Sequence, residues 1–247
     1  MAAPVAEFQT ASVAPKRVFF GGDRVTVSFS LDETMLPGAS RVDLLFVPKG
    51  NEGRPVRRIV LDPVLPGDLR QFEWNALTGA DKPAPDGRYS VFGTVADGPR
   101  RKLGEFRLAG HFFPVRGPHW ARGWLGLFGA PRSDDRVHQG YDVMARCGTP
   151  LAAVRAGKVV SRGYDPVLYG NFLRILGARE RRSYFYSHLR KPALPGLGER
   201  VSTGETVGRV GTTGNAKGTG CHLHFEIRAR GREIDPRLDL ARWDRFS

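Results

Sequence analysis

Polar and apolar side chains alternate along one short segment near the end of the chain, Cys221-His222-Leu223-His224-Phe225-Glu226-Ile227. Successive side chains of a β-strand point to opposite faces of a sheet. A strand over this segment therefore places its leucine, phenylalanine and isoleucine on a core face, and its two histidines and glutamate on the other. The alternation predicts a strand that packs on one face and carries polar chemistry on the other.

Four of the six histidines fall in three short segments, at His138, His188 and the pair His222 and His224. Asp142 lies four residues after His138. Imidazole nitrogens and carboxylate oxygens are ligands of catalytic zinc, and three protein ligands leave a fourth position for water. Two histidines then remain for proton transfer. These residues predict a hydrolytic metal site.

The size and composition are those of a folded, soluble protein with room for one large or two modest domains. Hydrophobic residues make up 40% of the 247 residues and charged residues 26%. No run approaches the roughly 18–20 apolar residues of a membrane span. The start, Met1-Ala2-Ala3-Pro4-Val5-Ala6, lacks the basic head and apolar stretch of a secretory signal. It also matches the small residues that remain once such a signal is removed.

The net charge of +13 is unevenly distributed along the chain. Residues 1–110 hold 15 Lys and Arg against 13 Asp and Glu, whereas the remaining 137 residues hold 23 against 12. The basic surplus therefore accompanies the histidines. Two interpretations stay open: attraction to a polyanion, either nucleic acid or an anionic cell wall, and an arginine-rich bias spread over a solvated surface.

The amino-terminal half consists of short alternating runs separated by turn residues, clearest at residues 25–30, 41–47, 57–61 and 89–95. About seven strands without a helical period predict an immunoglobulin-like β-sandwich. The passage around Trp74, followed by Asp86-Gly87-Arg88-Tyr89, resembles a strand pair of bacterial immunoglobulin-like modules. In those modules the tryptophan packs in the core.

The carboxy-terminal half is again rich in strand and turn signals, with strands expected at residues 154–160, 171–176, 183–189 and 222–228. Glycines are dense between Gly196 and Gly220, which predicts long loops on a compact antiparallel sheet. The chain as a whole is predicted to be mostly β. The expected organisation is a flexible amino terminus at 1–16, the sandwich at 17–110, a linker at 111–123, the second domain at 124–240 and a tail at 241–247.

The histidine segments together resemble a known enzyme family. His138-x-x-x-Asp142, then Tyr186-x-His188-Leu189, then His222 to Glu226 resemble the lysostaphin/LytM-type zinc endopeptidases, which cut peptidoglycan cross-links. The resemblance covers about residues 112–240. Further matching segments lie at 147–150, 157–160, 201–205, 208–214 and 234–236.

This resemblance implies a role for each motif residue. His138, Asp142 and His224 are expected to bind one Zn²⁺ per chain, and His188 and His222 to serve as general acid and base. The division of tasks between those two histidines stays open.

Four other positions have an expected role. Glu226 is expected either to orient a histidine or to be a solvated carboxylate. Arg132 is a candidate for substrate contact, because the loop at 128–132 lacks the tyrosine that some family members place there. His111 and His119 lie just outside the matched core and are candidates for an intramolecular ligand at the open zinc position.

Cys147 and Cys221 are the only cysteines. We expect a disulfide between them, which indicates an oxidising compartment outside the cytoplasm. Two reduced, buried thiols are the alternative. A thiolate ligand is disfavoured, because residue 221 points to the strand face opposite His222 and His224.

The sequence thus predicts a secreted, monomeric zinc endopeptidase, located extracellularly or in the periplasm and cell wall. Its expected partners are peptidoglycan stem peptides or cross-bridges within the anionic wall, without nucleic acid. One alternative is a catalytically silent LytM-like protein that activates other wall hydrolases, although such relatives have lost zinc ligands. Another is a basic nucleic-acid-binding protein, which rests on charge alone.

Overall fold

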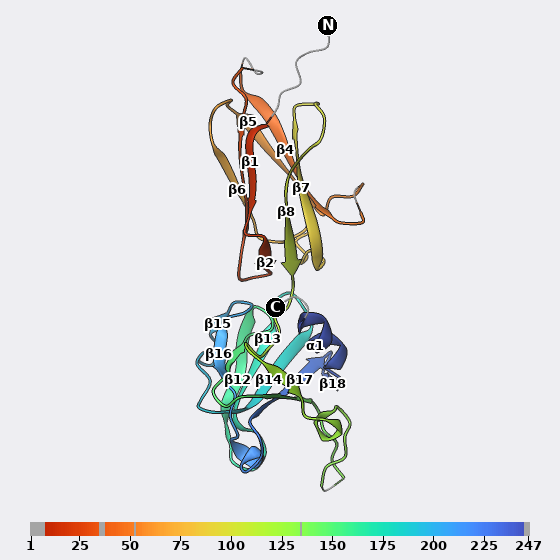
Figure 1. The fold of residues 1–247 in the computed structure, drawn as a ribbon, viewed down its shortest axis with the longest axis vertical. Helices are drawn as coiled ribbons and strands as arrows, with labels where there is room; N and C mark the ends of the chain where they lie inside the picture. Colours follow the sequence, from red (N-terminus) through yellow and green to blue (C-terminus); the bar gives the residue numbers. More distant parts are fainter. Residues whose placement is uncertain (1–7, 35–37, 52, 134, 245–247) are drawn as a thin grey trace. The chain divides into compact units, whose positions relative to one another are not determined.

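The computed structural model describes residues 8–34, 38–51, 53–133 and 135–244. The chain divides into two compact units, residues 1–110 and residues 111–247, and each has a hydrophobic core of its own. Both units are built mainly of antiparallel strands, which confirms the prediction of a mostly β protein (Figure 1).

Two sheets form the first unit. Its strands are β1 (Phe8–Ala14), β2 (Arg17–Phe19), β3 (Val25–Leu31), β4 (Ser40–Pro48), β5 (Arg57–Val64), β6 (Arg70–Trp74), β7 (Gly87–Val95) and β8 (Arg101–Ala109). One sheet has the order β1-β3-β6 and the other the order β2-β8-β7-β4-β5. In β3, Val25, Val27 and Phe29 are fully buried, because alternate side chains of the strand face the core.

The core of the first unit is aromatic and draws on both sheets. The ring of Trp74 in β6 lies 4.4 Å from that of Phe46 in β4 and 5.8 Å from that of Tyr89 in β7. Trp74 is therefore a core residue, as predicted, and the two sheets face each other across it. The likeness to immunoglobulin-like modules in particular stays a prediction.

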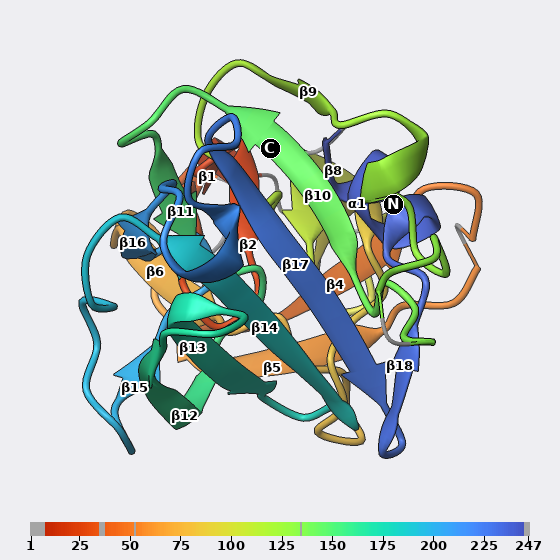
Figure 2. The ribbon, with the colours of Figure 1, turned by 90° about the horizontal axis from the view of Figure 1, so that it is seen from below.

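A larger sheet forms the centre of the second unit. Its elements, including the 3-10 helices η1 and η2, are β9 (His119–Ala121), η1 (Trp124–Gly126), β10 (Tyr141–Ala145), β11 (Pro150–Ala152), β12 (Gly157–Asp165), β13 (Gly170–Gly177), β14 (Arg182–Leu189), β15 (Arg200–Val201), β16 (Thr206–Arg209), η2 (Gly214–Ala216), β17 (His222–Ala229), β18 (Arg232–Ile234) and α1 (Arg237–Asp244). The sheet has the order β15-β12-β13-β14-β17-β10-β9, with β18 on β17, while β11 and β16 form a separate pair. Figure 2 shows β10, β17, β14 and β13 side by side.

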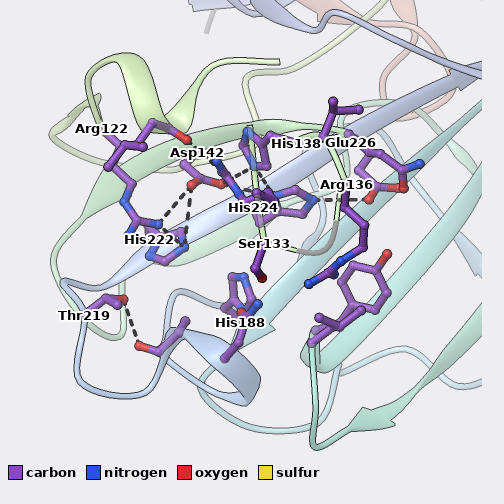
Figure 3. Close-up of a pocket in the computed structure, with 18 of the residues that line it drawn as sticks. Arg122, Ser133, Arg136, His138, Asp142, His188, Thr219, His222, His224 and Glu226 are labelled. Carbon is purple, nitrogen blue, oxygen red and sulfur yellow. Dashed lines mark hydrogen bonds and ion pairs between the residues drawn. The ribbon is translucent and has the colours of Figure 1, made fainter. Parts of the chain in front are cut away.

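The central strand β17 has the two faces that its alternation predicts. Its core face consists of Leu223, Phe225 and Ile227, all fully buried in the second unit. His222, His224 and Glu226 project from the opposite face, toward the site (Figure 3). Within the described residues, no helix combines the length and apolar character that crossing a membrane requires.

Three of the expected boundaries were wrong. Residues 8–14, expected in the flexible amino terminus, form β1, which pairs with β3. In the expected linker, residues 119–121 form β9 on the edge of the large sheet, and Phe113 is buried in the core. The expected tail includes the end of α1, where Trp243 is buried. Apolar side chains thus draw these segments into the two cores; residues 1–7 and 245–247 lie outside the described residues.

One expected strand begins later than predicted. The run at 154–160 becomes β12 only at Gly157. The preceding backbone has other partners, because the N–H of Val154 donates to Oη of Tyr186 at 2.8 Å and that of Ala156 to Oγ1 of Thr203 at 2.7 Å. Side-chain oxygens, rather than a neighbouring strand, thus accept the hydrogen bonds of these backbone N–H groups in the buried loop.

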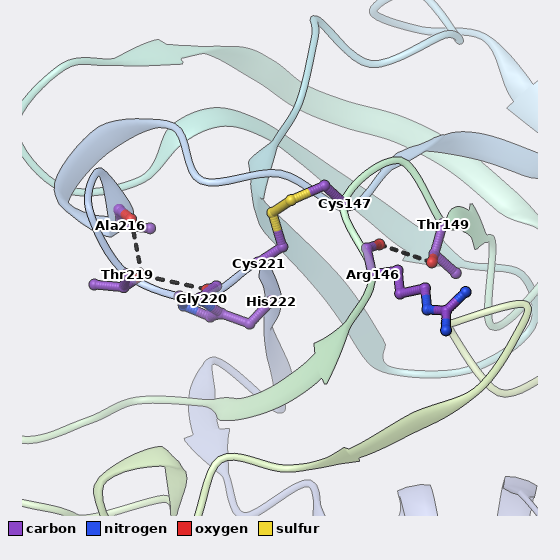
Figure 4. Close-up of a disulfide and its surroundings, with 8 residues drawn as sticks. All are labelled: Arg146, Cys147, Thr149, Ala216, Thr219, Gly220, Cys221 and His222. Carbon is purple, nitrogen blue, oxygen red and sulfur yellow. Dashed lines mark hydrogen bonds between the residues drawn. A yellow bond between two sulfur atoms is a disulfide. The ribbon is translucent and has the colours of Figure 1, made fainter.

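The predicted disulfide is present and lies next to the site. Cys147, in the turn after β10, is bonded to Cys221, which directly precedes β17 (Figure 4). The two Cα atoms are 5.2 Å apart, although 74 residues separate them in sequence. The bond ties the residue just before β17 to the turn after β10.

Candidate metal centre

Three side chains converge at one buried point between β10 and β17. His138 comes from the loop before β10, Asp142 from β10 and His224 from β17, where Asp142 and His224 are cross-strand partners. Nε2 of His138 lies 2.8 Å from Nδ1 of His224, and each of these atoms lies 3.0 Å from Oδ1 of Asp142 (Figure 3). All three side chains are buried.

The outer nitrogen of each histidine has an acceptor that fixes its proton. Nδ1 of His138 donates to the carbonyl of Leu127 at 2.8 Å, and Nε2 of His224 donates to Oε1 of Glu226 at 3.2 Å. With one proton on each ring, the inner nitrogens present lone pairs to each other and to Asp142. Three electron-pair donor atoms this close repel one another unless a proton or a metal ion lies among them, and ligands around tetrahedral zinc are themselves roughly 3.3 Å apart. The donor set fits a zinc ion.

Nearby charges also favour a cation at this point. Burial opposes the ionised form of Asp142, but its hydrogen bonds with His138 and His224 outweigh burial and hold the pKa of this carboxyl well below its usual range. Burial likewise opposes a charge on His224. Hydrogen bonds with Asp142 and Glu226 nevertheless raise the pKa of His224 to about 9. Without a metal ion, His224 therefore carries a second proton, on Nδ1, and a bound cation would take the place of that proton.

Gly140 allows the loop that carries His138 to approach β17. A Cβ atom at this position would lie 2.5 Å from the carbonyl oxygen of Phe225 and 2.8 Å from Cε1 of His224. Both distances are shorter than any ordinary contact. Glycine is therefore required between His138 and Asp142 for the cluster to close.

Two further histidines lie beside the cluster, with ring centroids 4.9 Å apart. Nδ1 of His188 donates to the carbonyl of Thr213 at 2.9 Å, and Nδ1 of His222 donates to that of Gly220 at 2.8 Å. Their Nε2 atoms are thus acceptors. Burial, with the neighbouring imidazoles, lowers the pKa of His188 to about 3, and burial also lowers the pKa of His222. Both rings are neutral at neutral pH and able to accept a proton.

An irregularity in β14 turns His188 toward the site. Simple alternation from the core residues Tyr184 and Tyr186 would place His188 in the core. Between its pairings with Asn171 and Leu173, however, β14 has one residue more than β13, which is a β-bulge. His188 has a φ of 59°, a left-handed conformation that is uncommon for a residue with a side chain. The bulge re-aims this side chain.

One cavity of about 800 Å³ brings together all five histidine and aspartate residues of the predicted site, namely His138, Asp142, His188, His222 and His224. Arg132 also lines this cavity, and its Nη2 donates to the carbonyl of Leu125 at 2.7 Å. Glu226 is buried rather than solvated and contacts His224, which agrees with the first of its two expected roles.

The two other histidines do not join the cluster. Nε2 of His111 lies 3.0 Å from Oη of Tyr184 and 3.2 Å from Oε2 of Glu180, and His119 stacks on Phe113 with 4.2 Å between ring centroids. Neither residue lines the cavity. The prediction that they are candidate ligands for the open zinc position was therefore wrong, because each histidine has other partners within the packed second unit.

Two arginines beside the site are not predicted by the sequence. Nη1 of Arg122 donates to Oδ2 of Asp142 at 3.0 Å and lies 3.4 Å from Nε2 of His222. Nη2 of Arg174 donates to Oε2 of Glu226 at 3.1 Å. No local motif marks Arg122, because its partners reach it only through the pairing of distant strands. Alternation along β13 is the one signal that would have placed Arg174 on the site face.

Comparison with known proteins places this cluster in a family. Residues 136–236 match the model of peptidase family M23. The chain is 38% identical over 104 residues to peptidoglycan DD-endopeptidase ShyC of Vibrio cholerae, a match that spans 41% of this chain and 22% of that protein. It is 32% identical over 116 residues to the lipoprotein NlpD/LppB homolog of Pseudomonas aeruginosa, spanning 47% of this chain and 37% of that protein.

The matches therefore cover well under half the length of these two relatives. The solved structure of LytU is 30% identical and spans 47% of this chain and 82% of that chain, with a TM-score of 0.42. The family match contains all five predicted site residues and confirms the resemblance stated from the motifs. Residues 136–236, within the second unit, are therefore a peptidase family M23 domain.

Proposed function

We propose that the second unit is a zinc endopeptidase that hydrolyses peptide cross-links of peptidoglycan. The observation that carries this proposal is the convergence of two imidazole lone pairs and one carboxylate oxygen, beside two neutral histidines in the same cavity. The first group can hold a metal ion with an open position for water. The second group can move the protons that amide hydrolysis requires.

His138, Asp142 and His224 would hold one Zn²⁺ through Nε2, Oδ1 and Nδ1, the three converging atoms. When bound, zinc lowers the pKa of water and polarises a carbonyl group. Glu226 would keep the proton of His224 on Nε2 and so leave Nδ1 available.

His188 and His222 would carry the proton transfers. One Nε2 accepts the proton of the attacking water as its oxygen bonds to the scissile carbonyl carbon. As the C–N bond then breaks, an imidazolium delivers a proton to the departing amine nitrogen. An imidazolium also stabilises negative charge on the carbonyl oxygen. Each ring donates from Nδ1 to a backbone carbonyl and so has Nε2 available. Either histidine could therefore accept the proton of water or deliver a proton to the amine.

The substrate assignment draws on the relatives and on charge. ShyC is named a peptidoglycan DD-endopeptidase. The basic surplus of the chain would favour an anionic wall, and Arg132 in the cavity would contact the stem peptide. The disulfide would be stable outside the cytoplasm, which supports an extracellular or periplasmic location. The protein is proposed to act as a monomer, without nucleic acid.

A catalytically silent activator of other wall hydrolases is the second candidate. The similarity to an NlpD/LppB homolog favours it. The presence and assembly of all five site residues favours catalysis instead, because an activator needs neither metal ligands nor two tethered histidines.

The two candidates are separated by incubating the zinc-loaded chain with purified peptidoglycan, one sample with D-alanyl cross-links and another with glycine bridges. Mass spectrometry of the released fragments should show loss of cross-linked species in one sample and a new free amine. If a chain with full zinc content cleaves neither wall but accelerates a second wall hydrolase, the activator is the correct assignment and the endopeptidase proposal fails.

A further inference from the structure

Three residues lie in one row across neighbouring strands on the site face of the large sheet. Arg174 of β13 pairs with Phe185 of β14, and Phe185 pairs with Glu226 of β17. The row ends beside His224, two residues from Glu226 on the same strand face. A side chain at the distant end of this row can therefore reach the metal centre across the sheet.

The contacts along this row are continuous. The guanidinium of Arg174 lies over the ring of Phe185, 4.5 Å from its centroid, and donates from Nη2 to Oε2 of Glu226 at 3.1 Å. The other carboxylate oxygen, Oε1, accepts from Nε2 of His224 at 3.2 Å. Nδ1 of His224 is one of the three converging donor atoms. Arg174 is thus two hydrogen bonds from the metal position.

The strand pattern explains why an arginine faces this way. In β13, Leu173 and Ile175 are fully buried in the core, so Arg174 between them faces the site. The Arg174 side chain is mostly buried, with 21% of it exposed. Its guanidinium ends against the carboxylate of Glu226.

Glu226 needs this partner because it is almost completely buried, with 2% of its side chain exposed. A buried carboxylate is tolerated only when both oxygens are paired. His224 pairs with one oxygen and Arg174 with the other. Without Arg174, one carboxylate oxygen loses its partner and the carboxylate is free to rotate, which releases its hold on the His224 ring.

We propose that Arg174 is a positioning residue of the metal centre: it fixes Glu226, and Glu226 in turn holds His224 with Nδ1 toward the ligand cluster. This inference rests on the proposed zinc site. The alternative is a purely structural role. In that case Arg174 neutralises the buried charge of Glu226 and stabilises the sheet, but does not affect the affinity for the metal.

Zinc affinity separates these two roles and needs no activity assay. The full chain and its Arg174→Met, Arg174→Lys and Glu226→Gln variants are titrated against a chromophoric chelator. Loss of a group that orients a metal-bound histidine weakens binding by about 10–100-fold, and we expect Arg174→Met and Glu226→Gln to fall in this range. Arg174→Lys, which keeps the charge, should recover part of the affinity.

A double variant tests whether Arg174 acts through Glu226. In the Glu226→Gln background, Arg174→Met should change zinc affinity by less than about twofold, because the carboxylate through which it acts is absent. The visible spectrum of the Co²⁺-loaded protein provides a second readout, and it should shift in the same variants. Arg228→Met is the matched control, because Arg228 also lies in the sheet and pairs with a carboxylate, but that carboxylate, Glu233, does not line the cavity as Glu226 does.

The outcomes are distinct. If Arg174→Met keeps wild-type zinc affinity and an unchanged Co²⁺ spectrum, the inference is overturned and the proposed zinc site still stands. The same conclusion follows if the effects of the two substitutions on zinc affinity are additive in the double variant. Absence of zinc binding by the unaltered chain overturns the proposed function itself. If Arg174→Met does not fold, Arg174→Gln, which keeps a hydrogen-bond donor without the charge, answers the same question by the same titration.

Discussion

Nε2 of His138 and Nδ1 of His224 lie 2.8 Å apart in a buried pocket, and both ring protons are held on the far side of the rings. Two nitrogens this close require a cation between them, either a second proton on His224, whose pKa is raised to about 9, or a metal ion. The pair is organised to hold such a cation.

Alanine at His138, Asp142 or His224 should abolish stoichiometric zinc binding, because a site of three protein ligands loses most of its affinity with any one of them. Elemental analysis of each purified variant gives the measurement. His119→Ala is the control and should keep its zinc, since His119 stacks on Phe113 away from the cavity. Full zinc content in all three ligand variants would show that the metal binds elsewhere.

Removal of the metal should lower the stability of the second unit. Zinc bound to the native state at a free concentration of a hundred times its dissociation constant adds about 2.7 kcal/mol to the free energy of unfolding. Thermal unfolding with and without a chelator should show this difference, and re-addition of zinc should reverse it. The Asp142→Ala variant should be insensitive to the chelator, so an equal shift in that variant would contradict the assignment.

His188→Ala and His222→Ala should keep zinc yet lose most hydrolysis. General acid–base catalysis typically contributes ~10²–10⁴-fold in rate, and neither ring belongs to the ligand cluster. Cross-link cleavage is measured by mass spectrometry at matched zinc content. Wild-type cleavage by either variant would remove that histidine from the mechanism.

Gly140→Ala should weaken zinc binding and destabilise the second unit by about 1–3 kcal/mol, because its Cβ would overlap the carbonyl oxygen of Phe225. Denaturant unfolding and zinc titration measure the two effects. Gly79→Ala is the matched control, since a Cβ there meets nothing within 4 Å. Equal stability and equal zinc affinity of the two variants would mean that the loop before β10 can shift without loss of free energy.

Replacement of both Cys147 and Cys221 by serine should lower the free energy of unfolding by roughly 4 kcal/mol on the chain-entropy estimate, because the bond closes a long loop. The comparison is made by denaturant unfolding without reductant. Since Cys221 directly precedes His222, we also expect slower hydrolysis at unchanged zinc content. A double variant as stable as the parent would contradict the stabilising role of the bond.

Much of the site could be predicted because its information is local. The spacing of His138 and Asp142 and the alternation at His222 and His224 place donors on defined faces, and strand geometry permits few other arrangements. The same alternation separated the core face of β17 from its site face. The expected linker at 111–123 was harder to judge, because its few apolar residues gain their partners only when the second core forms.

The sequence by itself determined the mostly β class and which histidine and aspartate residues meet at the site, and it made a bond between the only two cysteines the expected pairing, since each depends on residue type and short-range patterns. Tertiary structure decided how the site is supported. A β-bulge turned His188 out of the core, and strand pairing brought Arg122 to Asp142 and Arg174 to Glu226. These contacts join residues far apart in the chain, and buried carboxylates obtain their partners from whichever strand the fold places beside them.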